Sequence, residues 1–237
     1  PCAAAKFREL CDEFGMKLII DGAESLGSRY DGRAAGYGAH FVAISFNSNK
    51  IITGGGGGIL VCEDECDAAR IRYLSSQAKE PLPYYEHKEV GYNYRMGNLT
   101  AALVLSDLED LEERVRKKRS IFSSYSRLLS QVQGIECMPE PNLCLSNRWL
   151  TAVTIDRSRA SVSRDKICEY LWDNNVEVRP VWKPMHLQPA FQDSNNDVIG
   201  GRECEKIWRS GLCLPSGVGL KQFEIERVVE LVTRLVD

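Results

Sequence analysis

The stretch SFNSNKIITGGGGGILV, from Ser45 to Val61, places a single lysine, Lys50, shortly before five consecutive glycines and a strand-like apolar run. Glycine lacks a Cβ atom, so such a run suits a backbone that another group approaches closely. Mononucleotide phosphate loops place their glycines before the lysine and a helix after it, whereas here a strand follows the glycines. The order therefore favours a lysine that acts as an amine nucleophile beside a flat cofactor. A surface loop with a solvated lysine is the alternative.

Short apolar runs on both sides of this stretch are typical of buried strands. They are KLIID, which ends at Asp21, HFVAISF over residues 40–46, and GILVCE directly after the glycines. Helical spacing of apolar residues predicts a helix over 3–14, and a second helix from Asp64, as its N-cap, to about Gln77. Strands that alternate with helices in this way predict an α/β sheet with covered faces.

The second half of the chain has a different pattern. A long helical pattern runs from Asn98 to about Gln131, and we expect it to bend or break. The segments WLTAVTID, SRDKICEYLWDNN and VEVRPVW then alternate strand, helix and strand, and KQFEIERVVELVTRLV forms a final helix. We therefore place a domain boundary after residue 115, with a second domain over 116–237.

The composition excludes several classes of protein. The 237 residues are 43% hydrophobic and carry a net charge of −3, which is typical of a globular protein and disfavours a nucleic-acid partner. The basic run RVRKKR over 114–119 follows acidic residues, so we expect a solvated helix face. No apolar run is long enough for a membrane span. The nine cysteines are scattered without C-x-x-C pairs, which predicts reduced thiols in the cytoplasm and no metal site.

A nucleophilic lysine suggests pyridoxal 5′-phosphate as the cofactor. The ring nitrogen of this cofactor needs a carboxylate partner so that the ring can act as an electron sink. Asp21 suits that role because it ends a strand, although a turn-capping role is an equal alternative. Glu24 is a candidate for the ring hydroxyl or a plain surface residue, and Ser45 is a candidate for the phosphate or a strand-terminal serine.

Several blocks of the chain carry a resemblance to one enzyme family. DGAESLG, SFNSNKIITGGGGG and GYNYRMGNLTAAL resemble the DegT/DnrJ/EryC1/StrS aminotransferases, pyridoxal-phosphate enzymes of fold type I that act on nucleotide-linked keto sugars. YYEHKEVGYNYRM, SNRWLTAVTID, RPVWKPMHLQPAF and GLCLPSG resemble the bacillosamine-pathway subgroup. That subgroup aminates C4 of a UDP-linked 4-keto-6-deoxy sugar with glutamate as donor. The resemblance implies that 1–115 is the C-terminal part of a cofactor-binding large domain with a mixed sheet, and that 116–237 is a small α+β domain.

The resemblance also implies roles for individual residues. Lys50 is expected to bind the cofactor covalently and to move a proton between the cofactor and the sugar carbon. Asp21 is expected at the pyridine nitrogen, Glu24 at the ring hydroxyl and Ser45 at the phosphate. Asn93 is expected to reach the phosphate of the partner subunit, which implies a homodimer.

Two further residues are assigned to the substrate by the same resemblance. His186, in KPMHLQP, is expected to line the sugar-nucleotide pocket, and Trp182 is expected to form an apolar wall. A loop histidine and a core tryptophan are the alternatives for these two positions.

The chain departs from the family pattern at its start. Relatives have a longer N-terminal part, which includes a phosphate-cradling helix and an aromatic side chain that stacks on the pyridine ring, so we expect an N-terminally truncated copy. Half a sheet would expose strand edges and an apolar face, and we expect the chain alone to bind the cofactor weakly or not at all. A sugar 3-aminotransferase, a dehydratase and a cofactor-free regulatory or interaction domain are the alternatives. Lys50 favours amino transfer, because some dehydrating relatives have His at that position.

Overall fold

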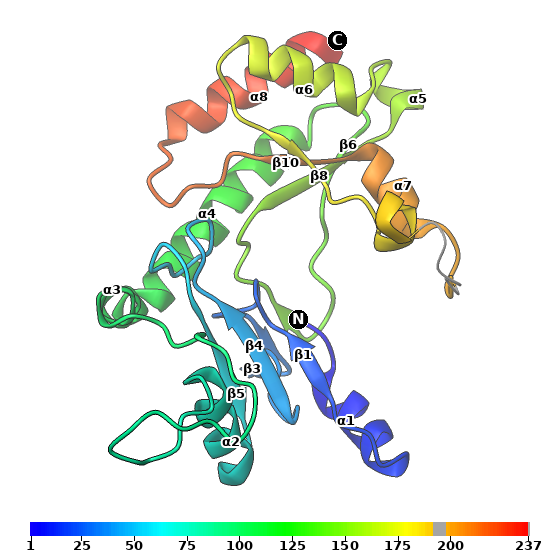
Figure 1. The fold of residues 1–237 in the computed structure, drawn as a ribbon. Coiled ribbons are helices and arrows are strands. Elements are labelled where there is room, and N and C mark those ends of the chain that lie inside the picture. Colours follow the sequence, from blue (N-terminus) through cyan, green and yellow to red (C-terminus); the bar gives the residue numbers. More distant parts are fainter. Residues whose placement is uncertain (192–197, 237) are drawn as a thin grey trace. The chain divides into compact units, whose positions relative to one another are not determined.

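The computed structural model describes residues 1–191 and 198–236. The chain divides into two compact units (Figure 1). The first unit contains Pro1–Val115 together with Glu140–Trp149, and the second contains Arg116–Pro139 together with Leu150–Asp237. The first segment of the first unit ends at Val115, the residue after which we placed the domain boundary. The segment 140–149, which the sequence analysis assigned to the second domain, folds with the first unit instead.

A three-stranded mixed sheet forms the centre of the first unit. Strand β4 (Phe41–Ser45) lies between β1 (Ile19–Asp21), which is parallel to it, and β5 (Gly58–Cys62), which is antiparallel. Because β1 and β4 run parallel, their carboxyl ends meet at one edge of the sheet, where α/β folds place their ligands. The expected mixed sheet is confirmed.

The helices of the first unit begin and end close to the expected residues. They are α1 (Ala4–Glu13), α2 (Glu65–Ser75), α3 (Asn98–Glu109) and the first turn of α4 (Leu111–Leu129). The carboxylate of Asp64 accepts hydrogen bonds from the backbone N–H groups of the first turn of α2, so the predicted N-cap is confirmed. The expected break in the long helical pattern lies at Asp110, between α3 and α4.

Residues 140–149 join the first unit through a second small sheet. Strand β2 (Arg29–Tyr30) pairs antiparallel with β3 (Arg33–Ala34) and with β7 (Cys144–Leu145). The sequence analysis did not identify these strands. They have two residues each, which is too short for a periodic signal.

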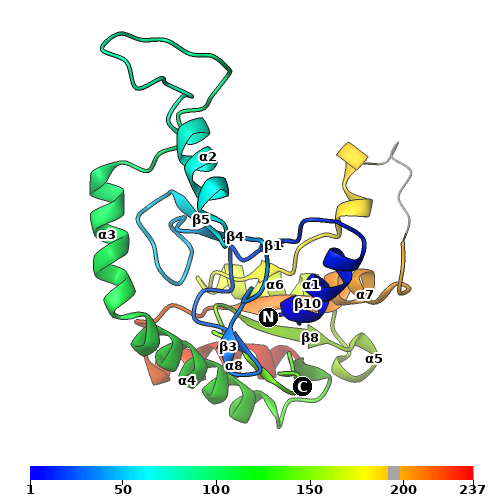
Figure 2. The same cartoon turned by 90° about the horizontal axis from the view of Figure 1, so that it is seen from below.

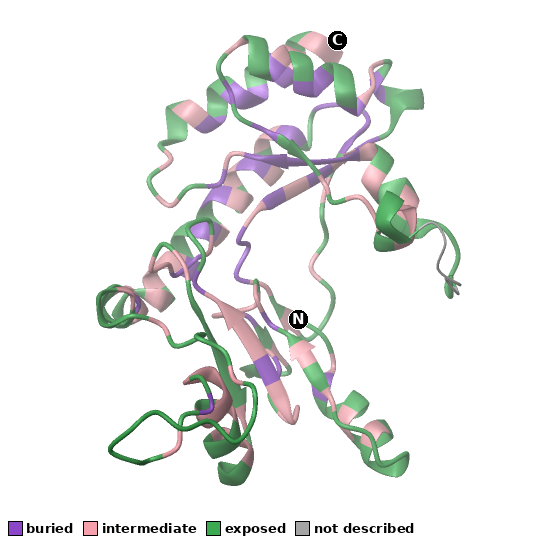
Figure 3. Ribbon diagram, viewed as in Figure 1, coloured by how far each residue is buried: buried purple, intermediate pink, exposed green. Residues whose placement is uncertain are grey.

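Strand β5 lies exposed at the edge of the main sheet (Figure 3). The exposed fractions are 48% for Ile59, 38% for Leu60 and 47% for Val61. Neighbouring residues of a strand point to opposite faces, so neither face of β5 is fully covered by the described residues. The prediction of covered faces is therefore wrong for this strand, and the prediction of an exposed apolar surface is confirmed.

The second unit has an α+β architecture, as expected. Its antiparallel sheet has the order β6–β8–β10–β9. The strands are β6 (Ile135–Cys137), β8 (Thr151–Ile155), β9 (Arg179–Pro180) and β10 (Gly211–Leu214). The helices are α5 (Arg157–Ala160), α6 (Arg164–Asp173), α7 (Glu203–Ser210) and α8 (Gln222–Val236), together with the 3-10 turns η1 (Met185–Leu187) and η2 (Pro189–Phe191).

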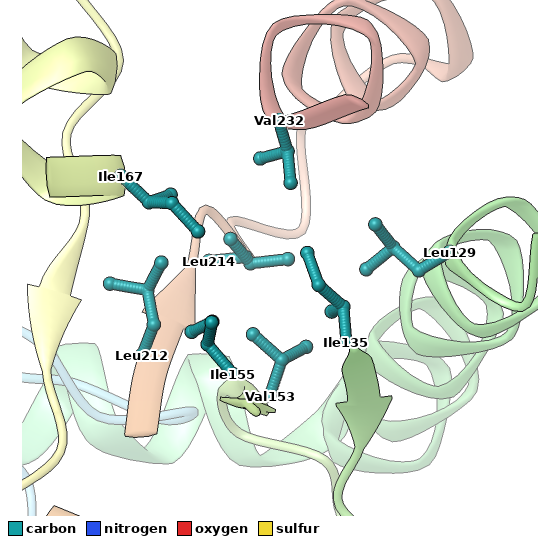
Figure 4. A pocket seen from close by; sticks show the side chains of 8 residues that line it. All are labelled: Leu129, Ile135, Val153, Ile155, Ile167, Leu212, Leu214 and Val232. Atoms are coloured by element: carbon teal, nitrogen blue, oxygen red, sulfur yellow. The ribbon is translucent and has the colours of Figure 1, made fainter. Parts of the chain in front are cut away.

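The principal hydrophobic core belongs to the second unit. Figure 3 shows buried residues on α6, α8, β8 and β10, and Leu171, at the centre of this cluster, is 0% exposed. The core contains a cavity of about 10 Å³, which is at the lower limit for one water molecule. Figure 4 shows that aliphatic side chains alone point toward this space: Leu129, Ile135, Val153, Ile155, Ile167, Leu212, Leu214 and Val232. The cavity is a packing void and offers no polar group to a ligand.

The basic run on α4 differs most clearly from the prediction at Lys118. Arg116 and Lys117 are exposed, as a solvated helix face requires, but Lys118 is buried. Lys118 lies three residues after the buried Val115 and three before the buried Ile121, so helical periodicity places it on the core-facing side.

Candidate active site

Lys50 lies in the turn that follows β4. Its backbone N–H donates to the carbonyl of Asn47, which closes the turn. Its Nζ lies 3.0 Å from Oε1 of Glu24 and 4.5 Å from the centroid of the Trp149 ring. The Lys50 side chain is only 12% exposed. The ammonium therefore contacts both a carboxylate and the face of an indole. Each of these contacts stabilises a positive charge.

Asp21 and Ser45 end the two neighbouring parallel strands. Asp21 pairs with Ala43, two residues before Ser45, so both side chains lie at the carboxyl edge of the sheet. Oδ1 of Asp21 accepts a hydrogen bond from the N–H of Ala23, and Oγ of Ser45 accepts one from the N–H of Asn47. Each side chain thus caps its own turn, in agreement with the structural alternatives. Their roles toward a cofactor stay predictions.

The carboxylate that contacts Lys50 is that of Glu24, three residues after Asp21. Glu24 was expected near the lysine only through the cofactor ring, and the direct ion pair was not predicted. The pair joins the turn after β1 to the turn after β4, so the structure brings two of the predicted site residues together.

The segment Asn147–Trp149 was not identified as part of the site. The Nδ2 group of Asn147 donates to the carbonyls of Glu24 and Leu26, at 2.8 and 2.9 Å. The Nε1 group of Trp149 donates to the carbonyl of Asn49 at 2.6 Å. The sequence carries no spacing signal for these contacts, because they join residues about a hundred positions apart. The only hint was the SNRW block in the family resemblance.

The glycine run is explained by the protein's own packing at two positions. A Cβ atom on Gly54 would lie 2.8 Å from Cγ2 of Thr100 on α3, and a Cβ atom on Gly58 would lie 2.7 Å from the carbonyl oxygen of Ile44 on β4. Both distances are too short for a real contact. Another group was expected to approach this glycine run closely. At these two glycines that group is part of the protein itself, namely α3 at Gly54 and β4 at Gly58.

Asn93 lies in the loop between α2 and α3, which extends beyond the end of α2 in Figure 2. Asn93 is exposed and forms an isolated antiparallel bridge with Ser76 at the base of the loop. Arg70 on α2 forms an ion pair with Glu89, and its hydrogen bond lowers the pKa of the Glu89 carboxyl. The loop is thus anchored to α2 at more than one point, with Asn93 exposed to solvent. The contact with a partner subunit stays a prediction.

His186 and Trp182 belong to the second unit. His186 lies in η1, and its Nε2 is 3.4 Å from Oε1 of Glu205 on α7. Trp182 is 61% exposed, so the alternative of a core tryptophan is wrong. Their expected place in a sugar-nucleotide pocket stays a prediction.

Residues 1–191 and 198–236 contain neither a metal-binding cluster nor a membrane-spanning helix. Within these ranges no three His, Cys, Asp or Glu side chains come together as a metal site. No helix in the same ranges has the length and apolarity to cross a bilayer.

Comparison with known proteins places this geometry in context. A family model described as the DegT/DnrJ/EryC1/StrS aminotransferase family matches residues 1–233. The chain is 44% identical over 230 residues to EpsN of Bacillus subtilis (strain 168), a match that covers 95% of this chain and 58% of that protein. It is 33% identical over 233 residues to a GDP-perosamine synthase of Vibrio cholerae, a match that covers 98% of this chain and 62% of that protein.

Solved structures are similar in both fold and sequence. The crystal structure of DesI in the presence of its TDP-sugar product superposes with a TM-score of 0.88 at 28% identity, and the match covers 100% of this chain and 59% of DesI. The aminotransferase TlmJ from Streptoalloteichus hindustanus gives a TM-score of 0.86 at 30% identity, with 97% of this chain and 61% of TlmJ covered. The chain therefore spans about 60% of the length of these proteins.

Proposed function

Because the chain belongs to the DegT/DnrJ/EryC1/StrS aminotransferase family, we propose that it carries the reactive lysine of a pyridoxal-phosphate-dependent aminotransferase for nucleotide-linked keto sugars. The observation that carries the proposal is the position of Lys50. Its amine lies at the carboxyl edge of the β1–β4 pair, with its charge held by Glu24. Ligands of open α/β sheets bind at this edge.

The side chains at this edge have the chemistry that pyridoxal phosphate needs. The amine of Lys50 can condense with the aldehyde of the cofactor, and the carboxylate of Asp21 can pair with a protonated ring nitrogen. Ser45 offers a hydroxyl to the phosphate. When bound, the cofactor supplies an electron sink for the carbon that gains or loses a proton.

The contribution of the chain itself is to hold and move protons. With the cofactor bound, the amine of Lys50 would serve as the base that moves a proton at the substrate carbon. Glu24 accepts a hydrogen bond from this amine and keeps it within reach of the sheet edge. Asp21 holds the proton on the ring nitrogen by supplying an opposite charge.

For the substrate we propose C4 of a UDP-linked 4-keto-6-deoxy sugar, with glutamate as amino donor and a homodimer as the active assembly. The blocks around Asn93 and His186 support this choice. Among relatives, the GDP-perosamine synthases are named for a GDP-linked sugar, and DesI was crystallised in the presence of its TDP-sugar product. Because their nucleotides differ, the support from relatives extends to the class of substrate, and the UDP group depends on the sequence blocks.

The proposal is tested by covalent capture of the cofactor. The chain is mixed with pyridoxal phosphate, reduced with borohydride, digested and analysed by mass spectrometry. Weak or absent binding by this chain alone was expected from its sequence, whereas the proposal requires the phosphopyridoxyl group on Lys50 in preference to the exposed Lys17. Labelling spread over lysines according to their exposure would contradict the proposal and favour a cofactor-free interaction domain.

The substrate is tested separately by product analysis. The full-length protein is supplied with glutamate and with UDP-, GDP- or TDP-linked 4-keto-6-deoxy sugars, and the aminated carbon is identified by NMR. We expect the UDP sugar to react fastest, with nitrogen at C4. Nitrogen at C3 would identify the 3-aminotransferase alternative.

A further inference from the structure

The segment Asn147–Trp149 contacts both turns that form the candidate site. We call it the NRW segment. It belongs to the part of the chain, 140–149, that folds with the first unit. Asn147 is 3% exposed and Trp149 is 8% exposed. Neither residue has a role in the proposed chemistry, so their contacts need an explanation of their own.

Asn147 holds the turn after β1. Its Nδ2 donates to the carbonyls of Glu24 and Leu26, and its backbone N–H donates to Oγ of the buried Ser28. The side-chain amide of Asn147 thus makes two bonds to this turn and its backbone makes a third, and buried bonds of this kind fix the backbone of the turn. It therefore fixes the point from which the Glu24 side chain extends.

Trp149 holds the turn after β4 at two places. The Nε1–H group donates to the carbonyl of Asn49, which is the peptide group directly before Lys50. The face of the same indole lies 4.5 Å from Nζ of Lys50. The backbone N–H of Trp149 also donates to Oδ1 of Asn147 at 3.0 Å, so the Asn147 side chain holds the backbone of Trp149 as well. One indole thus contacts both the backbone next to Lys50 and the amine at the end of its side chain.

We propose that Asn147 and Trp149 are positioning residues for the Lys50–Glu24 pair. Asn147 sets the turn that carries the carboxylate, and Trp149 sets the turn that carries the amine and supplies the surface on which the amine rests. The catalytic meaning of this arrangement rests on the proposed function. The placement of the amine does not, and it is measurable without a cofactor.

The first measurement reads the contact between the amine and the ring. Lysines are labelled with ¹³C at Cε, and the Lys50 signal is assigned by its loss in Lys50→Arg. Protons above an indole face are shielded, so we expect the Lys50 Hε signal upfield of the exposed lysines. Trp149→Leu should move it to the position of exposed lysines, whereas Trp149→Phe should retain part of the shift because it keeps an aromatic face.

The matched control is Trp172→Phe. The Nε1 group of Trp172 also donates to a backbone carbonyl, that of Val178 at 2.9 Å, but within the second unit. This variant removes the same kind of bond and should leave the Lys50 signal unchanged. An unshifted Lys50 signal in the wild type, or a signal that Trp149→Leu leaves in place, would overturn the proposal.

The second measurement reads the accessibility of the amine. Trace labelling with acetic anhydride is followed by mass spectrometry at Lys50 relative to Lys17. Because the Lys50 side chain is only 12% exposed, we expect several-fold faster labelling in Trp149→Leu and in Asn147→Ala. The Trp149→Phe variant keeps an aromatic face but lacks the N–H group. It therefore tests the bond to Asn49 separately from the contact between the ring and the amine. Rates that equal the wild type in both Trp149→Leu and Asn147→Ala would contradict the positioning role.

Covalent capture of pyridoxal phosphate separates this inference from the proposed function. If the wild type shows the shielded Lys50 signal but no preferred capture at Lys50, the proposed function fails and the positioning contact stands. If the wild type captures the cofactor at Lys50 and Trp149→Leu captures it equally fast, the positioning role is overturned and the proposed function stands. A large drop in capture in Trp149→Leu, with partial rescue in Trp149→Phe, would support both.

Discussion

At the scale of single residues, the two notable lysines differ in how their charge is accommodated. Lys50 has a carboxylate and an aromatic face beside its amine. Lys118 is 8% exposed, and its Nζ donates to the carbonyl of Ser216 at 2.6 Å. Burial lowers the pKa of Lys118 to about 8, because the charged form loses its hydration. The protein therefore carries a second unusual amine, on a helix face where the sequence suggested only solvated charges.

The lowered pKa of Lys118 predicts a dependence of stability on pH. Between the folded value of about 8 and the unfolded value of 10.5, the unfolded chain binds more protons, so the contribution of Lys118 to stability rises with pH in this window. Lys118→Met should remove this rise. From pH 7.5 to 9.5 we expect the difference in unfolding free energy between wild type and variant to change by roughly 2 kcal/mol in favour of the wild type.

Urea unfolding under reducing conditions at the two pH values measures this change. Lys117→Met is the matched control, because Lys117 is exposed on the same helix. A difference between wild type and Lys118→Met that stays constant across the two pH values would mean that Lys118 does not titrate in this range.

At the scale of elements, charged side chains anchor the loop over 76–97 to α2. Arg70 pairs with Glu89, while Glu80 accepts hydrogen bonds from Tyr73 and Lys88. The hydrogen bond from Tyr73 is the main cause that lowers the pKa of Glu80, and that from Arg70 lowers the pKa of Glu89. Both glutamates therefore stabilise the folded loop in their charged form.

This anchoring predicts a loop that opens in acid. Because the folded pKa values lie below the ordinary 4.5, the contribution is complete above pH 4.5 and is lost as the pH falls through the lowered values. At neutral pH, Glu89→Gln should mimic this loss and speed trypsin cleavage after Lys79 and Lys88. Glu86→Gln, which leaves the Arg70–Glu89 pair intact, should cleave at the wild-type rate. Equal cleavage of both variants would show that the pair does not restrain the loop.

At the scale of the whole molecule, the apolar core is unevenly divided between the two units. The large cluster around Leu171 lies entirely in the second unit. In the first unit, strand β5 leaves Ile59 and Val61 about half exposed. Since burial of apolar area is the main source of stability, the second unit should resist denaturant better than the first.

This division predicts two separable unfolding transitions. Hydrogen exchange with mass spectrometry at increasing urea should show peptides from 1–115 losing protection before those from 150–191 and 198–236. Leu171→Ala should destabilise the second unit by about 2–5 kcal/mol through the cavity it leaves and shift only the later transition. Val61→Ala, at an exposed position, should change neither by more than about 0.5 kcal/mol. A Leu171→Ala effect of equal size in both units would mean that the chain unfolds as one cooperative body.

The local features of this protein could be predicted from its amino-acid sequence. Helical periodicity located α2 with its Asp64 cap and indicated a bend or break within 98–131, and short apolar runs located the strands that lead to Asp21 and Ser45. These features depend on hydrogen bonds and burial within a few residues, which a pattern of residue types records directly. The family blocks likewise depend on residue order alone.

The surroundings of Lys50 could not be predicted from the sequence and became visible in the folded chain. Its contact with Glu24 spans 26 residues, and the bond from Trp149 to the neighbouring Asn49 spans 100. No periodicity encodes such contacts, because they depend on which turns the folded chain brings together. The same reason explains why Lys118 was expected in solvent and is buried, and why residues 140–149 fold with the first unit. The residue types of a segment determine which secondary structure it can form. The packing of the folded chain determines which segments come into contact.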